Sequence, residues 1–250
     1  MTGAGAAAGR AEAERRKLAH SLGVEPERLS MLAGLPAEEV RALRRQIADA
    51  LFRADRQHFV RVAALAKAVP VAVAARLTEA VLPALLAART AELLEPARAA
   101  ELVARISDGY LADVSAAMDA SRAPAVIAAI PPERVAAVAA ELGRRGEWVV
   151  IGGFVSQVSD QALARSVAVF DGGQLLRIGY VLDDADRLDR VTGLLSDRQL
   201  DELLAAAAAD GLWTEFTDLL DRLGPAQRSR LADRFARLTE QDRARFPVLP

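Results

Sequence analysis

The stretch Leu195-Ser-Asp-Arg-Gln-Leu-Asp-Glu-Leu-Leu204 carries the signals that decide the fold class. Ser196 and Gln199 fit a capping box. In this motif, two residues three positions apart at the start of a helix each accept, with the side chain, a hydrogen bond from the other's backbone amide. The apolar residues that follow keep the i, i+3, i+4, i+7 spacing of a helix face: Leu200, Leu203, Leu204 and Ala207. This spacing predicts a short amphipathic helix rather than a strand.

Similar start signals recur along the chain at intervals of 10 to 15 residues. Ser and Asp accept hydrogen bonds from the amides of a first helical turn. Pro is tolerated there because the amide hydrogen that it lacks would have no partner within the helix. The signals are Glu95-Pro96, Asp108, Ser121, Pro131-Pro132, Gly146, Ser159-Asp160, Asp171, Asp183, Ser196-Asp197, Asp210 and Gly224-Pro225. They predict helices of about three turns, which are too short to be stable alone and therefore stack on one another.

The predicted fold is all-α, a superhelical stack of short helices of the α-solenoid kind, because helices of similar length pair at a period near 25 residues. A compact irregular helical bundle is the alternative. The uncharged run Trp148 to Val155 contains β-branched residues, but no other segment offers it a partner strand, so we predict a buried helix. We divide the chain into a disordered tail (1–10), an N-terminal helical segment (11–58), a helical-repeat superhelix (59–240) and a C-terminal tail (241–250).

Three stretches carry a resemblance to a known family: Glu95-Pro-Ala-Arg-Ala-Ala-Glu-Leu-Val-Ala104, Ile130-Pro-Pro-Glu-Arg-Val-Ala-Ala-Val-Ala-Ala-Glu-Leu142 and Leu195-Ser-Asp-Arg-Gln-Leu-Asp-Glu-Leu-Leu204. Over residues 60–238 the pattern resembles the intracellular N-terminal domain of MgtE-type magnesium transporters, and armadillo-like pieces of the flagellar motor switch are similar. The resemblance implies a right-handed superhelix of short helices. This chain shows neither the regulatory pair nor the membrane helices of those transporters, so we expect a free-standing scaffold without transport activity.

Composition limits the function classes. The 250 residues are 52% hydrophobic and carry a net charge of −2, which is typical of a folded globular protein. The absence of cysteine excludes disulfides, thiolate metal sites and a cysteine nucleophile. Thirty of the 32 basic residues are arginine, a bias that the codons of a GC-rich bacterial genome explain, and 34 carboxylates balance them. With no secretory signal and no apolar run of about 20 residues, we expect a cytoplasmic protein without a membrane span.

No constellation of catalytic, cofactor-binding or metal-binding residues stands out. The two histidines, His20 and His58, lie outside any known catalytic or metal-binding spacing. The acidic run Asp183-Asp184-Ala-Asp186-Arg-Leu-Asp189 fails the EF-hand pattern, and acidic residues are favoured in a first helical turn by the helix dipole. Weak Mg²⁺ binding there, and hence a cation-sensing module, is the second alternative. The glycine pairs match no nucleotide-binding motif, so no cofactor is predicted.

DNA binding is the first alternative function. Residues 18–32 place Ala19, Gly23 and Leu29 at the spacing of a helix-turn-helix, and the run 41–67 has a net charge of +5. Against this, the second helix would begin with Glu25-Pro-Glu27, which DNA phosphates would repel. We therefore predict a non-enzymatic scaffold or adaptor that binds a protein partner along its helical surface, with self-association as an option and nucleic acid not its main partner.

Overall fold

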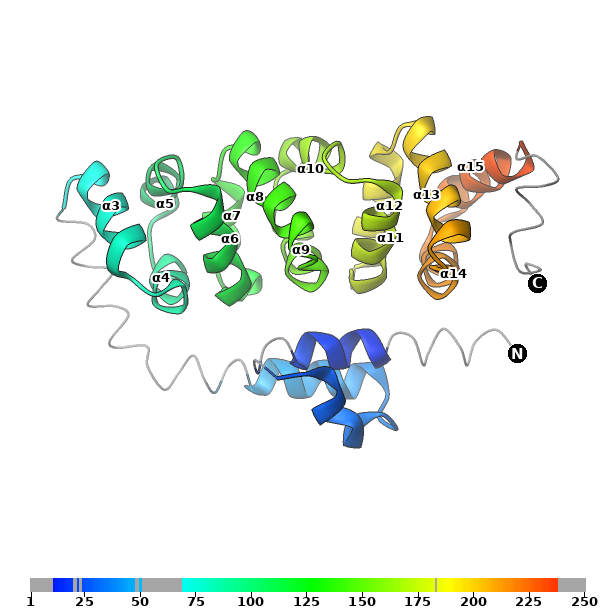
Figure 1. The fold of residues 1–250 in the computed structure, drawn as a ribbon, viewed down its shortest axis with the longest axis horizontal. Helices are drawn as coiled ribbons and strands as arrows, with labels where there is room; N and C mark the ends of the chain where they lie inside the picture. The colour runs from blue at the N-terminus through cyan, green and yellow to red at the C-terminus, as the bar shows by residue number, and fades with distance from the viewer. Residues whose placement is uncertain are drawn as a thin grey trace.

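The computed structural model describes residues 11–19, 22, 24–47, 50, 69–182 and 184–237. The elements formed by these residues are helices, with no strand among them, so the all-α prediction is confirmed (Figure 1). The run from Trp148 to Val155 is helical, as predicted. The tails predicted at 1–10 and 241–250 lie outside the described residues.

The helices follow one another with short connections. The N-terminal part contains helical residues 11–19, a 3₁₀ helix η1 (Pro26–Leu32) and helical residues 37–47. The rest comprises α3 (Val71–Val81), α4 (Ala84–Ala91), α5 (Pro96–Val103), α6 (Asp108–Ala117), η2 (Ala120–Arg122), α7 (Pro124–Ala128), α8 (Pro132–Arg144), α9 (Trp148–Val155), α10 (Asp160–Val167), α11 (Gly172–Val181), α12 (Ala185–Leu194), α13 (Asp197–Ala209), α14 (Trp213–Arg222) and α15 (Pro225–Ala236).

From α3 to α15 the helices form an elongated array (Figure 1). Most helices pack on the helix two positions further along: α4 on α6, α6 on α8, α8 on α10, α9 on α11, α11 on α13 and α13 on α15. The leucine stripe of α13 is buried as its spacing predicted, because Leu200, Leu203 and Leu204 are each at most 1% exposed. None of the described helices is long and apolar enough to cross a membrane.

Several predicted helix starts are confirmed by their capping bonds. Ser196 and Gln199 form the predicted capping box: the Ser196 hydroxyl accepts from the Gln199 amide at 3.3 Å, and the Gln199 side chain accepts from the Ser196 amide at 3.0 Å. Asp171 and Gln174 form a second box with the same geometry. Ser159 caps α10 by accepting from the Ala162 amide. Side-chain capping therefore positions the first turns of these helices.

Three predicted starts are wrong. Asp210 is the residue that ends α13, and α14 begins after Leu212. Gly146 follows the end of α8 with φ of +73°, a left-handed conformation that glycine adopts without a steric penalty. Ser121 lies inside η2, and the α-helix begins only at Pro124. Polar residues and glycine occur at both ends of helices, which explains these errors.

A repeated tripeptide of the form apolar-Ser-Asp links the helices of the array. Its apolar residue is buried, its Ser caps the next helix, and its Asp starts that helix. An arginine two helices further along donates to the carbonyl of the apolar residue and pairs with the Asp. The three cases are Ile106-Ser-Asp108 with Arg134, Val158-Ser-Asp160 with Arg187, and Leu195-Ser-Asp197 with Arg230. The donor–carbonyl distances are 2.5, 2.8 and 2.6 Å.

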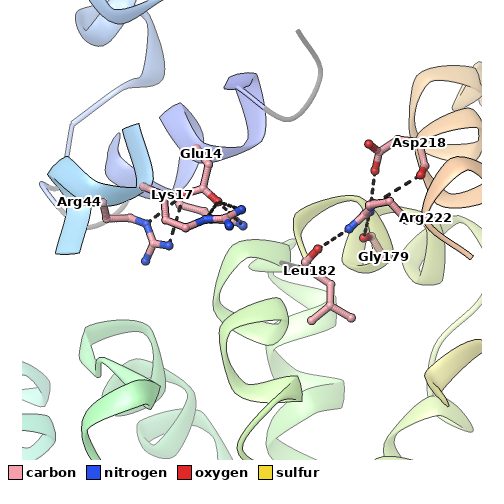
Figure 2. Close-up of polar contacts among 8 residues, drawn as sticks. Glu14, Lys17, Arg44, Gly179, Leu182, Asp218 and Arg222 are labelled. Atoms are coloured by element: carbon pink, nitrogen blue, oxygen red, sulfur yellow. Dashed lines mark hydrogen bonds and ion pairs between the residues drawn. The ribbon is translucent and has the colours of Figure 1, made fainter. Parts of the chain in front are cut away.

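A related contact joins α14 to the end of α11 (Figure 2). Arg222 donates to the carbonyls of Leu182 at 2.5 Å and Gly179 at 2.6 Å, and its guanidinium lies 2.6 Å from the carboxylate of Asp218. Asp218 is only 2% exposed. The last carbonyls of a helix lack some or all of their partners within that helix, and these arginines donate to carbonyls at such helix ends.

Glycine permits the closest helix contact of the array. At Gly172, in the first turn of α11, an added Cβ would overlap the backbone of Glu202 and Leu203 in α13. By contrast, Gly153 in α9 has no atom within 4 Å of the position where a Cβ would be. The backbones of α11 and α13 can therefore touch only because residue 172 has no side chain.

Candidate protein-binding face

Five of the nine large apolar side chains that are exposed among the described residues lie on α3 and α4. Val73, Leu77 and Val81 are 48%, 53% and 75% exposed, and Leu85 and Leu86 are 54% and 40% exposed. The three residues of α3 are four apart and so form one stripe along the helix. We call these five residues the α3–α4 face.

The burial pattern of α3 and α4 is the reverse of that in α13. Alanines face inward, since Ala74, Ala75, Ala87 and Ala88 are at most 7% exposed, while the larger side chains face outward. In α13 the leucines are buried and alanines such as Ala205 are exposed. A helix whose large apolar residues point to solvent is typical of a surface that another molecule covers.

Hydrogen bonds from α6 hold this face in place. The Ser107 amide and hydroxyl donate to the carboxylate of Glu79 in α3. The Tyr110 hydroxyl donates to the Leu82 carbonyl at 2.6 Å, between α3 and α4. Burial raises the pKa of Tyr110, and the charges of Glu79 and Asp113 raise it further, so the phenol remains a donor. The end of α3 and its junction with α4 are therefore anchored to α6.

A buried carboxylate lies just after α4: the Glu92 side chain is 1% exposed. Glu92 accepts from Arg89 at 3.0 Å and from the Asp119 amide at 3.4 Å. Burial raises its pKa above the ordinary value of 4.5, and Arg89 partly opposes this shift. Ionising Glu92 in the folded protein therefore lowers the free energy of unfolding, and the attraction to Arg89 offsets only part of this loss.

The N-terminal part of the predicted basic run is engaged within the chain (Figure 2). The Glu14 side chain is 2% exposed and binds three cations: Lys17 at 3.0 Å, Arg41 at 3.2 Å and Arg44 at 3.3 Å. Arg45 is exposed. The rest of the run, from 51 to 67, lies outside the described residues. Two of the arginines expected to meet phosphates thus already bind a carboxylate.

Helical residues 11–19 pack on the array. Ala13 forms a small apolar cluster with Tyr180 and Val181 of α11, against which Trp148 and Val149 also pack. Burial raises the pKa of Tyr180, while Arg16 lowers it. The N-terminal segment is therefore held beside α9 and α11 (Figure 1).

The predicted helix-turn-helix differs from its template. Its second element, η1, is a 3₁₀ helix in which Leu29 departs from helical angles and no residue is buried. Ala19 is buried, as the motif requires, and Gly23 lies outside the described residues. A 3₁₀ helix is narrower than an α-helix and presents its side chains with a different period. A helix-turn-helix has an α-helix at this position, and residues 26–32 form a 3₁₀ helix instead.

Among the described residues, the acidic run provides no assembled metal site. Asp184 caps α12 by accepting from the Arg187 amide at 3.0 Å, and Asp189 accepts from the Gly224 amide at 2.9 Å. Asp183, His20 and His58 lie outside the described residues. Within the described ranges, no three His, Cys, Asp or Glu side chains are arranged to hold a metal ion.

Comparison with known proteins found no matching family model, no similar curated protein and no similar solved structure.

Proposed function

We propose that this protein is a non-enzymatic helical scaffold that binds a protein partner through the α3–α4 face. The observation that carries the proposal is the reversed burial of these two helices, with alanines inside and Val73, Leu77 and Val81 outside. Fully burying a Val or Leu side chain is worth about 1.5–3 kcal/mol relative to exposing it. Covering this stripe is therefore a substantial source of binding free energy.

The repeated packing supports a finer proposal about the architecture. Helices pack on the second helix along, and the apolar-Ser-Asp tripeptide recurs with its arginine at three places. We propose that α3 to α15 form a superhelical repeat array of the kind that the resemblance to the MgtE N-terminal domain implies. In repeat arrays the terminal units need a covered or polar outer side. The apolar end of this array is consistent with a partner that covers it.

The partner that fits this face is an amphipathic helix. Residues at i, i+4 and i+8 on α3 form a linear apolar stripe, and α4 carries two more exposed leucines. A helix with its own apolar stripe can pack alongside such a surface. The exposed Arg76 and Glu79 on α3 would then lie at the rim, where charges set orientation more than affinity.

The test is affinity capture from the native host with three forms of the full chain. The face variant carries Leu77→Asp and Leu85→Asp, and the control carries Val169→Asp and Leu194→Asp, two residues of similar exposure elsewhere on the surface. We expect the wild type and the control to enrich the same proteins and the face variant to lose them, with unchanged circular dichroism for all three. Retention of the same proteins by the face variant would refute the proposal. Light scattering on the same samples tells whether the partner is a second copy of the chain.

A further inference from the structure

The α3–α4 face belongs to the helix pair at one end of the array (Figure 1), where α3 packs on α5 and α4 packs on α6. The other large apolar side chains that are exposed among the described residues lie apart from one another. Leu22 and Met31 are in the N-terminal part, Val169 follows α10, and Leu194 ends α12. On a second copy of this chain, the helix pair richest in exposed large apolar side chains is therefore the same face.

Pairing the face with itself gives an interface of the size found in weak, reversible dimers. Fully burying one Val or Leu side chain removes on the order of 100 Å² of apolar surface from water. The five residues of the face are about half exposed, so each copy contributes roughly 250 Å². A two-fold contact uses the five residues twice, and a little over half of a typical interface is apolar, which gives a total of roughly 900 Å². This value lies at the low end for specific interfaces.

The charged residues of α3 match across a two-fold axis. Arg76 and Glu79 are exposed, and they lie about 100° and about 160° from Leu77 in the same direction around the helix. Along the helix axis, Arg76 lies about 1.5 Å before Leu77 and Glu79 about 3 Å beyond it. When two copies of α3 pair antiparallel with Leu77 opposite Leu77, each Glu79 is therefore displaced by only about 1.5 Å along the axis from the Arg76 of the other copy. Opposite charges thus meet at two places.

We propose that the partner of the α3–α4 face is a second copy of this chain, bound about a two-fold axis with α3 antiparallel to α3 of the other copy. Val73 of each copy then packs on Val81 of the other, and Leu77 packs on Leu77. Because such a contact occupies the face of both copies, assembly stops at the dimer. The proposal rests on the function proposed for this face and names its partner.

The first test is sedimentation equilibrium of the full chain. We expect a monomer–dimer equilibrium with a Kd of roughly 1–100 µM, as suits an interface of this size, and no larger species. The variant with Leu77→Asp and Leu85→Asp should remain monomeric over the same concentrations, because the contact would bury carboxylates among apolar side chains. The control with Val169→Asp and Leu194→Asp should dimerise as the wild type does, and circular dichroism should be unchanged for all three.

The second test determines the register, and the absence of cysteine from the chain makes it specific. A disulfide requires two cysteines whose Cα atoms lie within about 7 Å of each other. Leu77→Cys lies on the proposed axis, so under mild oxidation it should form a disulfide-linked dimer on a non-reducing gel. Leu194→Cys, at a similarly exposed leucine outside the face, should stay monomeric on the same gel.

Three results would overturn the proposal: a wild type that is monomeric at 100 µM and above, a face variant that dimerises as tightly as the wild type, or cross-linking of Leu77→Cys no faster than that of Leu194→Cys. These results are distinct from a failure of the proposed function. A monomeric wild type that still captures host proteins through Leu77 and Leu85 refutes the dimer and retains the protein-binding face. Loss of neither capture nor dimerisation in the face variant refutes both.

Discussion

Replacing Gly172 by alanine tests whether α11 and α13 pack as closely as the structure shows. The added Cβ would overlap the carbonyl carbon and oxygen of Glu202 and the amide nitrogen of Leu203. These are backbone atoms inside α13, so no side-chain rotation can relieve the overlap. One helix must move by about 1 Å to restore van der Waals contact, which lies near 3.5–4.0 Å.

The expected cost follows from this geometry. Overpacking a close-packed core costs about 1–3 kcal/mol. For a protein of this size, 1 kcal/mol shifts the melting temperature by roughly 2–4 °C. Gly172→Ala should therefore lower the melting temperature by roughly 2–12 °C.

Gly153→Ala is the matched control, because Gly153 lies inside α9 with open space around the position of the Cβ. There alanine favours the helix by about 0.5–1 kcal/mol, which corresponds to an increase of roughly 1–4 °C. Thermal unfolding followed by circular dichroism measures both changes. Equal stability of Gly172→Ala and the wild type, or a loss of stability in Gly153→Ala, would refute the packing described for these helices.

Three further predictions concern charged groups. Burial raises the pKa of Glu92 in the folded state, so the folded protein keeps the Glu92 proton to higher pH than the unfolded chain does. The contribution of Glu92 to the free energy of unfolding therefore falls as pH rises from 4.5 through the folded pKa. In urea unfolding at pH 7.5, Glu92→Gln should therefore have a larger free energy of unfolding than the wild type, and this difference should shrink toward pH 4.5. A difference that does not change with pH would contradict the prediction. Millimolar Mg²⁺ should leave the melting temperature unchanged, since Asp184 is used as a helix cap, whereas a saturable rise abolished by Asp184→Asn with Asp186→Asn would establish a cation site. Fluorescence anisotropy at about 150 mM salt should show nucleic-acid binding weaker than ~10⁻⁵ M, and sub-micromolar binding abolished by Arg41→Glu with Arg45→Glu would favour the DNA-binding alternative.

Local features of the fold were predictable from the sequence. The capping box at Ser196 depends on two residues within one turn of each other, and the structure confirms it. The helix from Trp148 to Val155 was predicted because no other segment offers a partner strand, and it is also confirmed. The starts predicted at Asp210 and Gly146 are wrong because a polar residue or glycine between two helices can end the first as readily as begin the second.

The candidate sites depend on which helices are neighbours, which the sequence pattern does not specify. The stripe Val73, Leu77, Val81 has the spacing of a buried face, and only the packing of α3 shows that the alanines are inside instead. The apolar-Ser-Asp tripeptide is visible in the sequence, but its three occurrences are irregularly spaced and do not reveal the arginine that contacts each one.

The arginine contacts at the three tripeptides determine how the array responds to deformation. Each arginine contacts the junction at the start of the helix two positions earlier in the array. Each contact therefore joins only neighbouring helices, and the three contacts act in series along the array. Contacts of this kind would share a bend imposed at the α3 end among the three junctions that they join. If a partner binds there as proposed, its effect on the helices would be distributed along the array and not confined to one hinge.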